Sequence, residues 1–137
     1  VYFEAGQSPL NDAIIALNGT VKGLVNNVAV MSDVSPSYAP VGKSLVSISV
    51  LGSQSKDDLP ELVKAELSGW FGEDVRAWNH LRTDVIRQAL PSQRETKPVG
   101  VLEIEGVLLC GDYAVSASIE GAMKSGQAAA IAILTSR

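Results

Sequence analysis

The chain has 137 residues, of which 46% are apolar, enough for the core of one small domain or of two partial domains. Its 11 basic and 15 acidic residues give a formal net charge of −4, which argues against a surface that binds nucleic acid or an anionic membrane. One histidine, His80, cannot build a His-based metal cluster, and one cysteine, Cys110, excludes an internal disulfide, so we expect a reducing, cytoplasmic location. The longest apolar run, residues 128–134, is far shorter than the roughly 20 residues that a membrane span needs.

The first third of the chain has the pattern of β-strands. Residues 1–3 begin abruptly and read like a cut through a strand of a longer protein. Residues 13–17, 24–31 and 44–51 are short, rich in β-branched side chains and bounded by turn residues, which predicts three strands. In the last of them, valine and isoleucine alternate with serine, the period of two that marks a half-buried strand. Two prolines and a glycine before it predict an irregular connection.

An amphipathic helix with clear ends is predicted next. Asp57 or Asp58 can cap its start, Pro60 suits its first turn, and Gly72 is well placed to end it. Its apolar residues recur at spacings of three and four and predict one buried side: Leu59, Leu62, Val63, Leu67, Trp70 and Phe71.

The chain then changes character. Residues 74–79 can add another helical turn, and the central Thr, Val and Ile of residues 80–90 favour a strand that ends at Pro91. Residues 92–100 are a polar connection, so we place the boundary between two parts, 1–91 and 92–137, there.

The second part ends in a predicted strand, turn and helix. Residues 107–110 form a short apolar run suited to a buried strand, Gly111 and Asp112 break it, and a helix is expected from about Ser118 to Leu134. The start of such a helix offers unpaired N–H groups and a partial positive charge, which suit a phosphate or an electron-rich ring edge. Asp112 either accepts a hydrogen bond from a sugar hydroxyl or serves only as a turn residue.

The composition of this helix is unusual. Gly121 and Gly126 lie in its interior, where each glycine costs roughly 1 kcal/mol relative to alanine. Alanine and serine surround them, and only Glu120 and Lys124 make an evident exposed pair. A helix of such small residues is expected to lie against other backbones or against a flat cofactor.

Residues 111–130, GDYAVSASIEGAMKSGQAAA, resemble the closing FAD motif of the flavin amine oxidase, phytoene desaturase and protoporphyrinogen oxidase superfamily. The shared pattern is an apolar strand, Gly-Asp, a short loop and then Ser-x-x-Gly-Ala-x-x-Ser-Gly-x-x-Ala-Ala. The matching positions are Gly111, Asp112, Ser118, Gly121, Ala122, Ser125, Gly126, Ala129 and Ala130. Residues 70–91 are similar, more loosely, to the segment in which the substrate domain of the family returns to its FAD domain.

The resemblance implies roles for single residues. Asp112 would bind the ribityl chain of FAD, and the N–H groups near Ile119 and Glu120 would face the pyrimidine edge of the flavin. Gly121 and Ala122 would let the helix approach the cofactor closely. The cofactor-binding residues implied in this way are Gly111, Asp112, Ser118, Ile119, Glu120, Gly121 and Ala122.

One departure from the family pattern limits what this chain can do alone. The family binds the FAD diphosphate with an N-terminal GxGxxG, and that motif does not occur in these 137 residues. We therefore expect the pyrophosphate and adenosine sites in a missing N-terminal part, which is the expected partner, and weak or no FAD binding by this chain alone. A sheet cut in this way is expected to expose an edge that can pair with another copy.

The sequence thus predicts an α+β fold: a mainly antiparallel sheet with one amphipathic helix, from a substrate domain, then the last strand and helix of a Rossmann-type FAD domain. The resemblance implies hydride transfer to flavin from a small, apolar substrate, a polyene first and an amine second. The residues identify no acid, base or metal ligand. The alternative is a stand-alone, non-catalytic interaction domain in which the small-residue helix only packs on a sheet.

Overall fold

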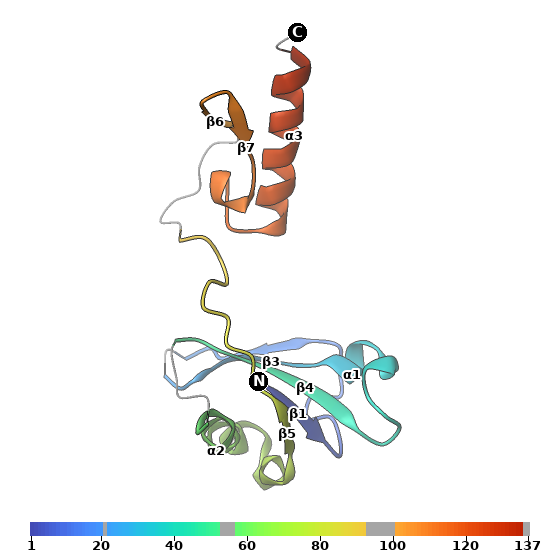
Figure 1. Cartoon of the computed structure of the whole chain (residues 1–137). Coiled ribbons are helices and arrows are strands. Elements are labelled where there is room, and N and C mark those ends of the chain that lie inside the picture. The colour runs from blue at the N-terminus through green and yellow to red at the C-terminus, as the bar shows by residue number, and fades with distance from the viewer. Residues whose placement is uncertain (21, 53–56, 93–100, 136–137) are drawn as a thin grey trace. The chain divides into compact units, whose positions relative to one another are not determined.

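The computed structural model describes residues 1–20, 22–52, 57–92 and 101–135 (Figure 1). The chain divides into two compact units, Val1–Val85 and Ile86–Arg137, and each is described by itself. The predicted α+β class and the mainly antiparallel sheet are confirmed. The assignment of residues 1–91 to a substrate domain and of residues 92–137 to an FAD domain stays a prediction.

The first unit is built on a five-stranded antiparallel sheet. The strand order is β2-β3-β4-β1-β5, so the first strand in the chain lies between the fourth and the fifth. The bounds of the strands are Tyr2–Ala5 (β1), Ile15–Leu17 (β2), Val25–Val30 (β3), Ser44–Val50 (β4) and Asn79–Arg82 (β5). The three strands predicted in the first third are confirmed, and the abrupt start of the chain forms β1.

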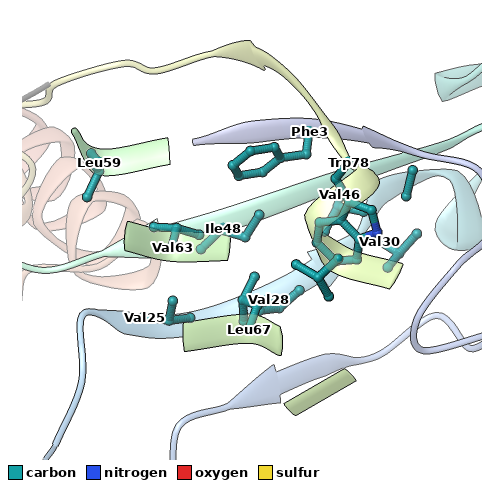
Figure 2. Packing of buried hydrophobic residues seen from close by; sticks show 12 residues of the cluster. Phe3, Val25, Val28, Val30, Val46, Ile48, Leu59, Val63, Leu67 and Trp78 are labelled. Carbon is teal, nitrogen blue, oxygen red and sulfur yellow. The ribbon is translucent and has the colours of Figure 1, made fainter. Parts of the chain in front are cut away.

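The core of the first unit lies between this sheet and helix α2, Leu59–Phe71 (Figure 1). Alternate residues of the central strands, Val28 and Val46 among them, point toward the helix and are fully buried, as Figure 2 shows. Val63 and Leu67 meet them from α2 and are also 0% exposed. Each such side chain contributes roughly 1.5–3 kcal/mol to folding, so this layer holds the unit together.

One residue predicted on the buried side of α2 is exposed, and two others, Trp70 and Phe71, are partly buried. Leu62 is 46% exposed, whereas Leu59, Val63 and Leu67 are buried. Leu59, Val63 and Leu67 are spaced by four, and Pro60 is buried in the first turn, so the buried stripe is narrow and Leu62 lies beside it.

The ends of α2 agree with the sequence in part. Pro60 lies in the first turn, and Gly72 ends the helix with a φ of +89° while its N–H donates to the Ser68 carbonyl at 3.0 Å. Asp58 precedes the helix but makes no side-chain capping bond, because its own backbone is already close to helical.

Three segments of the first unit differ from the predicted structure or add detail to it. The strand predicted over residues 80–90 ends at Arg82, because Arg82 pairs with Tyr2, the first residue of β1, and the described residues provide no further strand for pairing. The connection before β4 begins with one helical turn, α1, Met31–Val34, followed by a 3₁₀ helix, Pro36–Tyr38. The extra turn predicted after α2 is present as a 3₁₀ helix, Glu73–Ala77.

The second unit is a β-hairpin followed by a helix. Its elements are β6, Leu102–Ile104, β7, Val107–Leu109, a 3₁₀ helix, Asp112–Ala114, and α3, Ile119–Thr135. Glu105 and Gly106 join the strands with positive φ angles of 51° and 80°, as a tight hairpin turn requires. The polar connection predicted over residues 92–100 lies, apart from Ser92, outside the described residues.

The strand predicted over residues 107–110 is present, but the prediction that it is buried was wrong. Val107 is 58% exposed and Cys110 is exposed, because β7 has one strand neighbour, β6, among the described residues of its unit. A hairpin and one helix bury only one side of each strand. The two strands are antiparallel, so the Rossmann-type assignment is not established by this arrangement.

Candidate functional site

The candidate site is the segment from the end of β7 to the first turn of α3, residues 111–122. The chain turns at Gly111, and the Ala114 N–H donates to the Gly111 carbonyl at 3.1 Å. Asp112 begins the 3₁₀ helix, and its carbonyl accepts from the Val115 N–H at 3.3 Å. Asp112 therefore lies, half-buried, just beyond the C-terminal end of a strand, where the sequence analysis places it.

Helix α3 begins directly after Ser118, as predicted. The Ser118 hydroxyl accepts a hydrogen bond from the Gly121 N–H at 3.0 Å, and its carbonyl accepts from the Ala122 N–H at the same distance. These two bonds make Ser118 the capping residue. For the N–H groups of Ile119 and Glu120, the described part of the chain offers no hydrogen-bond acceptor. Two donors thus remain at the positive end of a 17-residue helix.

One side of α3 packs closely on this segment. Its buried residues are Gly121, Ser125 and Ala129, which follow one another at intervals of four. A Cβ at position 121 would overlap the backbone carbonyl oxygen of Ser116 and lie 2.6 Å from the Ser116 hydroxyl oxygen. The Ser125 hydroxyl accepts a hydrogen bond from the Gly111 N–H at 3.1 Å. On this side of α3, the small residues allow contact with the chain's own backbone, which is the first of the two roles expected for them; the second was contact with a flat cofactor.

Other positions of α3 have open space beside them within the unit. Ile119 is 82% exposed, and a Cβ at Gly126 would meet no atom within 4 Å. The predicted pair is present, with Lys124 Nζ 2.7 Å from Glu120 Oε1. The hydrogen bond from Lys124, with the charge of its ammonium group, lowers the pKa of Glu120 below its ordinary value. The Glu120 carboxylate is therefore ionised, and its charge is compensated beside the free donors.

Residues outside this segment have structural roles. The His80 ring packs edge-on against Phe3 at 5.6 Å between centroids, and its Nε2 lies 2.9 Å from the Thr83 hydroxyl. Trp78, at 7% exposure, is part of the core of the first unit.

A surface cleft in the first unit was not anticipated from the sequence. It has a volume of about 510 Å³ and lies between the loop that follows β2 and the C-terminal half of α2, with Leu17, Gly23, Glu66 and Trp70 in its lining. The Glu66 carboxylate is already used there, because it accepts the Leu24 N–H at 2.6 Å and the Val25 N–H. A glutamate that bonds backbone across 42 residues leaves no pattern in the sequence.

The described residues were compared with the requirements of a metal site and of a membrane-spanning helix. In the described ranges, no group of three or more His, Cys, Asp or Glu side chains is placed to hold a metal ion. None of the helices in those ranges combines the length and the apolar character that crossing a membrane requires.

Comparison with known proteins identifies a family. The family model described as flavin containing amine oxidoreductase matches residues 7–134, which covers both units and the whole candidate site. No curated protein and no solved structure matches the chain.

Proposed function

The chain belongs to the flavin-containing amine oxidoreductase family, and from that premise we propose that residues 111–122 bind the flavin of a longer FAD-dependent oxidoreductase. The observation that carries the proposal is the pair of N–H groups, at Ile119 and Glu120 at the start of α3, for which the described residues provide no acceptor. Such donors fit the electron-rich pyrimidine edge of a flavin, and the partial positive charge of the helix start favours the extra negative charge of the reduced ring.

Each residue of the segment then has a distinct task. Asp112 accepts hydrogen bonds from the ribityl hydroxyls at the end of β7, and Ser118 holds the first turn of α3 so that the two free donors point outward. Ala122 presents no more than a methyl group, and Gly121 lets α3 pack on the Ser116 backbone, which keeps the helix start close to the loop before it. When bound, the flavin supplies the chemistry by accepting a hydride from a substrate C–H bond.

In this proposal, the second unit is the last strand and helix of a Rossmann-type FAD domain whose first part lies upstream, and the first unit belongs to the substrate domain. Two exposed apolar side chains on the sheet face away from α2, which also carries Asn27, Ser47 and Ser49, support an apolar substrate. By register, Ile15 and Leu17 share that face with Ala29 and Asn27, and they are 63% and 71% exposed. A small apolar molecule, such as a polyene, is the first substrate class. An amine is the second, and the description of the family favours it.

The test is flavin retention by the complete protein. Asp112→Ala is expected to raise the dissociation constant for FAD by at least about tenfold, the effect of losing one hydrogen bond to a charged group. Glu103→Ala, which removes an exposed carboxylate from β6, is the matched control and should leave FAD binding unchanged. Equal FAD affinity in the wild-type protein and in the Asp112 variant would remove Asp112 from the site. A complete protein without any affinity for FAD would remove the proposal.

A further inference from the structure

A serine is buried at the centre of the contact between α3 and the end of β7. Ser125 is 0% exposed, and its hydroxyl oxygen lies 3.1 Å from the Gly111 nitrogen, from which it accepts a hydrogen bond. Fourteen residues of chain separate the two partners, so this bond joins the middle of the helix to the turn that precedes Asp112.

The neighbours of Ser125 on the helix show why the position matters. Gly121, one turn earlier, contacts the Ser116 backbone, and Ala129, one turn later, is buried at 7% exposure. Neither position has a polar side-chain atom, so neither side chain can form a hydrogen bond to the loop. The Ser125 bond is directional, so among the three it alone fixes the turn at Gly111 along the axis of α3.

We propose that Ser125 is a positioning residue for the flavin, because it sets the place of Asp112 relative to the free N–H groups at the start of α3. The inference rests on the proposed function. Asp112 follows Gly111 directly, and the donors of Ile119 and Glu120 lie between one and two helical turns before Ser125. The Ser125 hydroxyl thereby links the turn beside Asp112 to the helix whose start would hold another part of the same cofactor.

An alanine at this position would keep the packing and lose the bond. The methyl group fits the space of the serine side chain, so α3 is expected to stay folded, while the Gly111 N–H loses its acceptor. The turn can then shift along the helix, and Asp112 shifts with it. Ser125→Thr keeps a hydroxyl at the same atom and is the rescue variant, and Gln127→Ala, an exposed change two residues away, is the control.

The experiment has two parts. In the 137-residue chain, amide hydrogen exchange is measured at Gly111; Ser125→Ala should speed it by at least about fivefold, the factor that corresponds to one hydrogen bond, while Gln127→Ala should not change it. In the complete protein saturated with FAD, Ser125→Ala should alter the visible absorption band of the flavin and raise the dissociation constant by about fivefold, and Ser125→Thr should reverse most of both effects.

The possible outcomes distinguish the positioning role of Ser125 from the proposed function of residues 111–122. Unchanged Gly111 exchange in Ser125→Ala would overturn the role of the hydrogen bond. Faster exchange with an unaltered flavin spectrum and affinity would overturn the positioning role, while Asp112→Ala would still weaken FAD binding. If neither variant changes FAD binding, Asp112 leaves the proposed site and the inference fails, whereas a complete protein without affinity for FAD would overturn the proposed function itself.

Discussion

The two interior glycines of α3 allow a matched test of how the second unit is packed. Gly121→Ala and Gly126→Ala each replace glycine by alanine inside the same helix, so both gain about 1 kcal/mol of helix propensity. At position 121 the added Cβ overlaps the Ser116 carbonyl oxygen, which is backbone and cannot rotate away. At position 126 nothing lies within 4 Å of it.

The magnitudes follow from these contacts. Forcing a methyl group into a filled site costs about 1–3 kcal/mol, so Gly121→Ala should change the stability of α3 by between about 0 and −2 kcal/mol after the propensity gain. Gly126→Ala should stabilise α3 by about 1 kcal/mol. The propensity gain cancels between the two variants, so their difference measures the clash alone.

Native-state amide hydrogen exchange in the middle of α3 is the suitable assay, because it reports the opening of this helix without the first unit. Exchange in Gly121→Ala should be about 5- to 150-fold faster than in Gly126→Ala, which corresponds to a difference of about 1–3 kcal/mol. Equal exchange rates in the two variants would refute the close contact between α3 and the loop at Ser116.

Three further changes test other parts of the structure. Leu67→Ala should destabilise the first unit by about 2–5 kcal/mol, whereas Leu62→Ala, on the exposed side of α2, should cost no more than about 0.5 kcal/mol. Urea unfolding followed by tryptophan fluorescence measures both losses, since both tryptophans lie in that unit, and similar losses would contradict the narrow buried stripe. Glu66→Ala should cost about 1.5–3 kcal/mol in the same assay, because two N–H groups at the start of β3 lose a charged acceptor, and a loss below that of Leu62→Ala would contradict this role. Lys124→Met should raise the pKa of Glu120 toward its ordinary value in an NMR titration, because the lowering comes from Lys124, and an unchanged titration curve would show that the pair does not form. The stabilisation by this pair is present above the ordinary pKa of Glu120 and is lost as pH falls through the lowered pKa.

The sequence was most informative where one local signal decided the structure. The alternation in residues 44–50 predicted β4, and Gly72 marked the end of α2, because each depends on the chain's own neighbours. The predicted strand over residues 80–90 was wrong beyond Arg82 because strand length depends on a partner, and β1 begins at Tyr2. Strand β6 was not predicted although Glu105-Gly106 is a turn signal, because each strand of the β6–β7 hairpin is only three residues long.

The candidate site was predictable in outline. The start of α3 at Ser118, the place of Asp112 and the pairing of Glu120 with Lys124 follow from local rules for helix ends and helix faces, and the structure agrees with them. The contacts that hold the segment together were not predictable. Which side of a helix rich in glycine and alanine is buried depends on the packed loop, and only coordinates reveal that Ser125 bonds Gly111.

The central claim is that the start of α3 and the end of β7 lie against a flavin. It is tested most directly by hydrogen–deuterium exchange of the complete protein, measured by mass spectrometry with and without FAD. The account predicts slower exchange in peptides that cover residues 111–122 when FAD is bound, with no change in the peptide of α2. Bound FAD that leaves exchange in residues 111–122 unaltered would contradict it.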